Sequence, residues 1–250
     1  MPPDGPNMDI VYFVKLDPEN DSEELRYSLR SLSNIPHGKV FIVGEKPDWV
    51  INVDYIPVPQ SGSKNENVST SLRTAVESNL ISNDFILMND DFFVMKKIAA
   101  LPMLNFGYMK DIIQSYDARY RKSTRYIEAM KSLYDALVAK GFSHPISYEL
   151  HIPMAINRQR AQKVFNEARS ERIYQFRSYY GNCFGIGGEV VSDVKIFIDS
   201  IHNHPEFERS PDTYLQSQTF LSSTGGAFKR GRAGDYIRDS FPDRSVYESY

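Results

Sequence analysis

The first ninety residues alternate between short apolar runs and polar or amphipathic stretches. The runs DIVYFVKL (9–16), KVFIVG (39–44) and DFILM (84–88) have the length and composition of buried strands. DYIPVP (54–59) is predicted to be a short edge strand, because a proline cannot donate a hydrogen bond to a neighbouring strand. Four strands are therefore expected before residue 90.

The stretches between these strands have helical periodicity. Leucines at positions 25, 29 and 32 share one helical face, and Asp21 followed by Glu24 is typical of a capping box. A second helix is expected from Val68 to Leu80, after a polar loop at 60–67. Strands that alternate with helices predict an α/β protein with a mostly parallel central sheet and helices on both faces.

Residues 99–147 have a different pattern and are predicted to be a helical insertion. The segment STRYIEAMKSLYDALVAKG places apolar side chains on one helical face, and Gly141 is expected to end that helix. A further helix is expected to open on Asn157, and the tail from Phe228 onward is expected to be rich in loops. The length of 250 residues suits a single domain with this insertion.

Composition narrows the functional classes. The 41% hydrophobic residues can form a sizeable core, and a net charge of −3 argues against a protein that mainly binds a nucleic-acid backbone. Cys183 is the single cysteine, which excludes an intramolecular disulfide and a cysteine-based zinc site. The first residues do not resemble a signal peptide, and no apolar run reaches the ~18 residues of a membrane span, so a soluble, cytoplasmic protein is expected.

Two adjacent carboxylates stand between two apolar runs. Asn89, Asp90 and Asp91 follow the fourth strand, and in parallel sheets ligands bind beyond the carboxyl ends of the strands. Mg²⁺ and Mn²⁺ prefer oxygen ligands, commonly one or two carboxylates completed by substrate phosphates. The alternative is a solvated Asn-Asp turn.

Other residues are candidates for catalysis or phosphate binding. His151 lies between apolar residues, which suits a packed core histidine or a general base. Arg177 in an aromatic setting can stack on tyrosines or hold a phosphate. The basic cluster Lys229, Arg230 and Arg232 is either a solvated loop or a phosphate contact.

Two further motifs are not assigned to a site. GNCFGIGG fits neither nucleotide-binding glycine pattern and is read as a turn. A zinc site at His202 and His204 is not expected, because no other ligand supports it.

Four blocks of the sequence, in order, resemble the Stealth proteins. This family includes capsular polysaccharide phosphotransferases and the lysosomal-enzyme GlcNAc-1-phosphotransferase. The matching residues are Asp9 to Tyr12, then ELRYSLRS at 24–31 with NDDFF at 89–93, then His151 to Pro153 with Phe176-Arg177, and finally Phe241, Pro242, Ser245, Tyr247 and Glu248. The pattern is also similar to phage-encoded proteins labelled glycosyltransferases.

The resemblance implies a GT-A-like fold and a metal-dependent transferase that uses a nucleotide-sugar donor, usually a UDP-sugar. It implies Mn²⁺ or Mg²⁺ at Asp90 and Asp91, and His151, Asp90 and Arg177 as catalytic or phosphate-holding residues. The donor is expected to contact a further set of residues: Tyr12, Arg26, Arg30, Asn89, Lys229 and Arg230. The family's usual glutamate upstream of the acidic pair has no ungapped counterpart, and Glu77 is the nearest acid.

Several functions are compatible with these residues. The leading hypothesis is transfer of a sugar, or of a sugar 1-phosphate, to a hydroxyl on a glycan, a protein or a modified DNA base. A phage-type glycosyltransferase acting on hydroxylated DNA bases is one alternative, and a non-catalytic glycan-binding protein is another. A metal-dependent phosphoesterase ranks last, because it needs more His and Asp ligands than the sequence offers.

Overall fold

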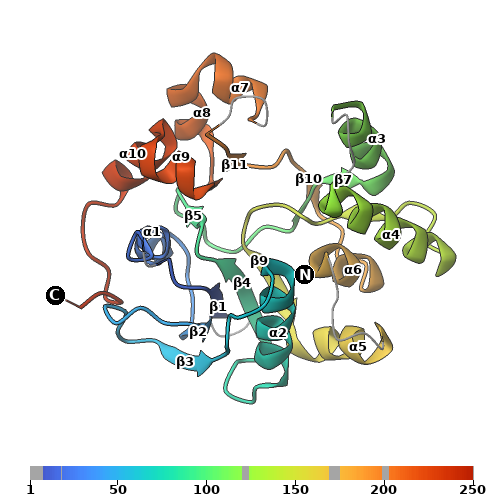
Figure 1. Ribbon diagram of the computed structural model, residues 1–250, viewed down its shortest axis with the longest axis horizontal. Coiled ribbons are helices and arrows are strands. Elements are labelled where there is room, and N and C mark those ends of the chain that lie inside the picture. Colours follow the sequence, from blue (N-terminus) through green and yellow to red (C-terminus); the bar gives the residue numbers. More distant parts are fainter. Residues whose placement is uncertain (1–7, 18, 120–123, 169–174, 199–202, 250) are drawn as a thin grey trace. The chain divides into compact units, whose positions relative to one another are not determined.

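A computed structural model describes residues 8–17, 19–119, 124–168, 175–198 and 203–249 (Figure 1). The chain forms two compact units. The first unit consists of Met1–Leu101, His151–Arg158 and Val194–Tyr250, and the second of Pro102–Leu150 and Gln159–Asp193. The predicted insertion thus lies largely in the second unit, which also includes a later part of the chain.

A five-stranded sheet forms the centre of the first unit. Its strands are β1 (Asp9–Val14), β2 (Val40–Gly44), β3 (Asp54–Pro57), β4 (Asp84–Asn89) and β9 (Met154–Asn157). They lie in the order β3-β2-β1-β4-β9, with the first four parallel and β9 antiparallel to β4. The predicted α/β class with a mostly parallel central sheet is therefore confirmed.

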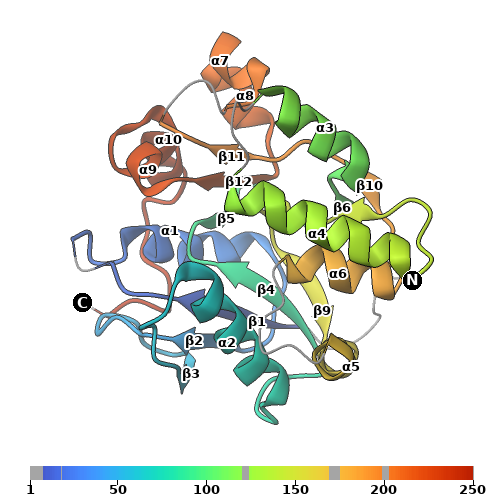
Figure 2. The same cartoon turned by 45° about the vertical axis from the view of Figure 1, so that its right-hand side comes forward.

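The connections of this sheet reverse direction between β1 and β4. Helix α1 (Glu23–Ser31) leads from β1 to β2 on one side, and α2 (Lys64–Glu77) leads from β3 back across to β4. Because such crossovers are right-handed, the two helices cover opposite faces, as Figures 1 and 2 show. A sheet that reverses in this way has a ligand-binding crevice outside the carboxyl ends of the two central strands.

Both helices begin differently from the prediction. The residue before α1 is Ser22, which has a left-handed backbone (φ 52°) and makes no side-chain cap bond, so the capping box expected at Asp21 and Glu24 is wrong. The capping box stands instead at α2, where Ser63 and Glu66 satisfy each other's backbone amides. Helix α2 therefore begins at Lys64, inside the segment predicted to be a loop.

A smaller sheet in the first unit combines β5 (Phe92–Val94), β12 (Phe220–Ser223) and β11 (Lys195–Ile196). Strand β12 pairs antiparallel with β5 and parallel with β11. Around it lie η1 (Leu32–Asn34), α7 (Pro205–Arg209), α8 (Pro211–Ser217), α9 (Gly225–Arg230) and α10 (Arg232–Ser240). The tail is thus more helical than predicted, because Phe228, Ala233 and Ile237 bury an apolar face against this sheet.

The second unit is mainly helical. It contains α3 (Met109–Arg119), α4 (Arg125–Ala139), α6 (Phe176–Cys183) and most of α5 (Arg158–Ala168), with the short strands β6 (Leu104–Asn105), β7 (Gly107–Tyr108), β8 (Ile146–Ser147) and β10 (Glu189–Val190). The helix predicted before Gly141 is confirmed as α4, capped by Thr124. None of the helices in the described part of the chain has the length and apolar character that a membrane crossing requires.

Candidate active site

The acidic pair lies where the chain leaves the central sheet for the smaller one. Strand β4 ends at Asn89, Asp90 and Asp91 form the turn, and β5 begins at Phe92. Asparagine and aspartate suit this turn because their side chains can satisfy neighbouring backbone groups. Since β4 is one of the two strands at the reversal of the sheet, the pair lies at the predicted crevice.

Asp91 is held by residues from the smaller sheet. The Lys195 ammonium on β11 lies 2.6 Å from Asp91 Oδ2, and the Ser222 hydroxyl on β12 donates to the same oxygen at 3.4 Å. Burial opposes ionisation of Asp91, but Lys195 and then His151 outweigh it and hold the pKa of Asp91 below its usual range. Asp91 is therefore a fixed carboxylate with a lysine as its direct counter-ion.

Asp90 and Glu24 behave in the opposite way. Burial and the charge of Asp91 raise the pKa of Asp90 to about 7. Glu24, in the first turn of α1, accepts a 3.5 Å hydrogen bond from Ser223, and burial followed by the charges of Asp90 and Asp91 raises the pKa of Glu24 to about 8. Asp90 and Glu24 can therefore exchange protons near neutral pH, whereas Asp91 stays ionised. This arrangement is suited to acid-base chemistry.

Basic residues reach the acidic pair from two other elements. His151 stands before β9, and because β9 is antiparallel to β4, this places His151 at the carboxyl end of β4. Its ring meets that of Phe92 edge-on, with centroids 6.3 Å apart. Lys64, the first residue of α2, lowers the pKa of both aspartates through its charge. The first unit therefore brings the predicted residues His151, Asp90 and Asp91 together.

The acidic pair has the donor chemistry for a divalent cation. Asp91 Oδ1 is buried and has no hydrogen-bond partner among the described residues, so one carboxylate oxygen is open to a ligand. Asp90 adds a second carboxylate, and substrate phosphates commonly complete such a shell. Within the described ranges, however, no group of three or more His, Cys, Asp or Glu side chains is arranged to hold a metal ion. The pair fits a two-carboxylate site that needs other ligands.

Three residues predicted to contact the donor make contacts within the protein. Tyr12 is fully buried and its hydroxyl bonds to that of Ser28, so the structure does not support a ligand contact for Tyr12. Arg30 holds both carboxylate oxygens of Glu248, at 2.8 and 2.9 Å, and Arg26 reaches Glu248 at 3.2 Å. The second and fourth sequence blocks thus bind each other, and a donor contact by either arginine would compete with Glu248.

The remaining predicted residues have different positions. Asn89 ends β4 directly before the acidic pair. Lys229 pairs at 3.2 Å with Asp17, shortly beyond the carboxyl end of β1, and Arg230 is exposed beside it at the end of α9. Arg177 belongs to α6 of the second unit, where it donates to the Leu150 carbonyl at 3.0 Å. The roles of these residues stay predictions.

Other sequence candidates are separated from the pair or not described. Glu77 ends α2, at the opposite end of that helix from Lys64, and its carboxylate lies 4.0 Å from Arg73. Glu24, in contrast, lies beside the acidic pair. His204 caps α7, whereas His202 lies outside the described residues.

Three residues of this site were not identified from the sequence: Glu24, Lys64 and Lys195. Glu24 was visible as the first residue of ELRYSLRS, but its position resembled a helix cap. Lys64 lies in a polar segment that the sequence predicts to be a loop, and no motif surrounds Lys195. Their role depends on strand order and helix placement, which the local sequence does not show.

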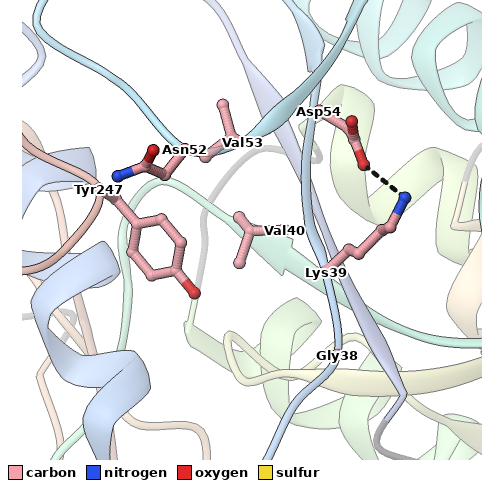
Figure 3. Close-up of a pocket in the computed structure, with 7 residues that line it drawn as sticks. All are labelled: Gly38, Lys39, Val40, Asn52, Val53, Asp54 and Tyr247. Atoms are coloured by element: carbon pink, nitrogen blue, oxygen red, sulfur yellow. Dashed lines mark ion pairs between the residues drawn. The ribbon is translucent and has the colours of Figure 1, made fainter.

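Two cavities lie away from this site. One of about 360 Å³ is lined by residues just before and at the start of β2 and β3 and by Tyr247, with the Lys39–Asp54 ion pair (3.3 Å) at its wall (Figure 3). The other, of about 460 Å³, lies between α1 and the C-terminal segment. Because the first cavity is at the amino ends of parallel strands, it is on the opposite edge of the sheet from Asp90 and Asp91.

The α/β architecture and the acidic pair can be compared with known proteins. No protein-family model matches the chain, and the search of curated proteins found no match either. Among solved structures, the chain is similar to the galactosyltransferase LgtC in complex with donor and acceptor sugar analogues, at 11% identity over 96% of this chain and 97% of that one, with a TM-score of 0.48. A second LgtC structure, of an active-site mutant, matches at 10% identity over 96% and 98%, with a TM-score of 0.47.

A glycosyltransferase involved in glycosylation of the major capsid of PBCV-1 is also similar. Its identity is 12% over 94% of this chain and 98% of that chain, with a TM-score of 0.40. Identities and scores at this level say nothing of the reaction that this chain performs. The Stealth resemblance is not confirmed by these comparisons.

Proposed function

We propose that this chain is a nucleotide-sugar-dependent transferase with a GT-A-like core. Its reaction would move a sugar, or a sugar 1-phosphate, from a UDP-sugar or similar donor to a hydroxyl acceptor. The supporting observation is the convergence of Asp90, Asp91, Glu24, His151 and Lys195 at the reversal point of the sheet. The four ordered sequence blocks that resemble Stealth proteins point to the same donor class.

A divalent cation, Mn²⁺ or Mg²⁺, held by Asp90 and Asp91 would neutralise the diphosphate of the donor. The protein's own contribution begins with positive charge. Lys64 and Lys195 already act on the two aspartates, so both ammonium groups are close enough to attract a phosphate to this edge. Asn89 and Lys229 are proposed to contact the donor from the same edge of the sheet.

The proton of the acceptor hydroxyl needs a base. His151 is proposed for this role because its charge acts on Asp91 and because an imidazole is the commonest general base in enzymes. Attack of His151 on phosphorus is the alternative role in sugar-phosphate transfer. Glu24, whose pKa is raised to about 8, can supply a proton to a leaving oxygen near neutral pH. Arg177 is left out of this scheme, which uses the first unit alone.

The experiment that tests the proposal is a screen of nucleotide sugars with Mn²⁺, read by mass spectrometry. Release of UDP indicates sugar transfer, and release of UMP indicates sugar-phosphate transfer. Asp91→Asn should reduce turnover about a hundredfold or more, since charge stabilisation in the site is lost. Asp239→Asn, at an exposed aspartate of α10, is the matched control and should retain normal turnover.

Removing Asp91 also leaves Lys195 without its counter-ion, so folding is checked by circular dichroism. Asp90→Asn, which leaves the Asp91–Lys195 pair intact, is the second variant and should also lose most turnover. Full turnover in either folded variant with Mn²⁺ supplied would contradict the metal role. Donor binding without release of either nucleotide, across glycan, peptide and hydroxylated DNA acceptors, would favour the non-catalytic binding protein.

A further inference from the structure

The ion pair between Lys195 and Asp91 is largely buried. The side chain of Lys195 is 9% exposed and that of Asp91 15%, and the distance from Nζ to Oδ2 is 2.6 Å. Lys195 comes from β11, more than a hundred residues beyond Asp91, and β11 is held in place by pairing with β12. The pair is therefore fixed by the smaller sheet and does not depend on a flexible loop.

The two oxygens of the Asp91 carboxylate are used unequally. Oδ2 accepts from both Lys195 and Ser222, whereas Oδ1 is buried and has no hydrogen-bond partner among the described residues. A buried acceptor without a donor is costly, and a carboxylate can accept several hydrogen bonds or metal contacts. Asp91 Oδ2 is therefore paired with Lys195, and Oδ1 is available to a ligand.

Lysine differs from a metal ion as a counter-ion in one useful way. Its single charge sits on a flexible four-carbon stem, so the ammonium can move to another anion within reach. A divalent cation that binds Asp91 brings a second positive charge next to Lys195, and the two then repel each other at close range. Either Lys195 keeps the carboxylate and the cation binds weakly, or the ammonium moves away.

We propose that Lys195 is the resident counter-ion of Asp91, that it competes with a divalent cation for this carboxylate, and that the displaced ammonium binds the diphosphate of the donor. The inference rests on the proposed function for its last step only. It assigns Lys195 to donor binding, a role for which the sequence offered no motif. It also predicts that metal and nucleotide bind more tightly together than separately.

Direct binding measurements test the competition. The Kd for Mn²⁺ is measured by electron paramagnetic resonance of free Mn²⁺, without nucleotide, for the wild type, Lys195→Met and Lys195→Arg. Lys195→Met should bind Mn²⁺ at least about tenfold more tightly, whereas Lys195→Arg should stay near the wild type because the charge is retained. Lys97→Met, at an exposed lysine of the same unit, is the matched control and should not change the Kd.

The second measurement is the Kd for UDP at saturating Mn²⁺, by isothermal titration calorimetry. Lys195→Met should weaken UDP binding by about tenfold, opposite in sign to its effect on Mn²⁺. If Lys195 only screened the charge of the acidic pair, its removal would change the Mn²⁺ affinity and leave the UDP affinity unchanged. An unchanged or weakened Mn²⁺ affinity in Lys195→Met, or an unchanged UDP affinity, would overturn the inference.

A second variant and a separate turnover assay make these outcomes interpretable. Lys195→Gln, which retains a hydrogen-bond donor without the charge, replaces Lys195→Met if that variant does not fold, and the same shifts are expected. Turnover of nucleotide sugars by the wild type is measured separately. If the wild type turns over a nucleotide sugar but the variants have unchanged Kd values, the inference fails and the proposed function stands. If the Mn²⁺ affinity shifts as expected but no nucleotide sugar is turned over, the proposed function fails.

Discussion

Glu24 is a residue whose placement costs stability. Its carboxyl group is half-buried beside Asp90 and Asp91, and burial followed by these two charges raises its pKa to about 8. In the unfolded chain the same group ionises near the usual glutamate pKa of 4.5. The folded state therefore holds the Glu24 proton more tightly than the unfolded state does, and this contribution to stability is lost as the pH rises from about 4.5 to 8.

Glu24→Gln should consequently stabilise the metal-free protein at pH 8 by about 2 kcal/mol, less than the full pKa shift would give because solvent screens the partly exposed carboxyl group, and change little at pH 4. For a chain of this length that corresponds to roughly 4–8 °C in Tm. Thermal unfolding with a chelator present, at pH 4, 6 and 8, measures the effect. Glu77→Gln, at the exposed acid nearest to the pair among the upstream candidates in the sequence, serves as the comparison and should show no pH-dependent gain.

A Glu24→Gln variant that loses stability equally at both pH values would contradict this account of the site. If Glu24→Gln stabilises the protein and also loses activity, stability and activity place opposite demands on this position. A group whose burial is unfavourable at neutral pH is commonly retained for its chemistry. Loss of turnover in the stabilised variant would connect the raised pKa to the proposed proton transfer.

At the scale of single elements, α2 illustrates what the local pattern hides. Apolar periodicity begins at Val68, but the helix begins four residues earlier because Ser63 and Glu66 cap its first turn. Lys64, in that first turn, carries one of the charges that act on the acidic pair. The cap therefore determines where a cation of the candidate site stands.

Ser63→Ala should remove the cap and lower stability by about 1 kcal/mol. Its expected signature is a midpoint shift in urea without a change in slope, since the surface exposed on unfolding stays the same. Ser61→Ala, at an exposed serine two residues earlier, is the control. Equal behaviour of the two variants would mean that Ser63 and Glu66 contribute nothing to the helix start.

The elements themselves were largely predictable, and their partners were not. Apolar runs of strand length predicted β1, β2, β3 and β4, and the acidic pair at the end of β4 followed from the alternation of strands and helices. Arg26 and Arg30 are four residues apart and so share one face of α1. Spacing cannot show which carboxylate they meet, because Glu248 is more than two hundred residues away. Lys195 was missed for the same reason.

At the scale of the whole molecule, the first unit joins an early segment of the chain to a late one. The segment after Phe241 returns to α1, where Glu248 binds Arg30 and Arg26, and Asn52 donates to the Val246 carbonyl at 2.6 Å. His37 and Tyr247 add a 2.8 Å hydrogen bond. The block Phe241 to Glu248 thus closes the unit at the side of α1, and its motif residues have a structural explanation.

Glu248→Gln tests this closure. Burial alone would raise the pKa of Glu248, but hydrogen bonds from Arg30 and Ser245 outweigh it and lower the pKa from its usual 4.5 to about 2. The carboxylate therefore stabilises the fold above pH 4.5, and this stabilisation is lost as the pH falls toward 2. The variant should lose about 2 kcal/mol at pH 7, and the gap should narrow toward pH 3 in urea unfolding. Asp243→Asn, an exposed acid of the same segment, should match the wild type throughout. A gap that is constant between pH 7 and 3 would show that Glu248 acts through its shape and not through its charge.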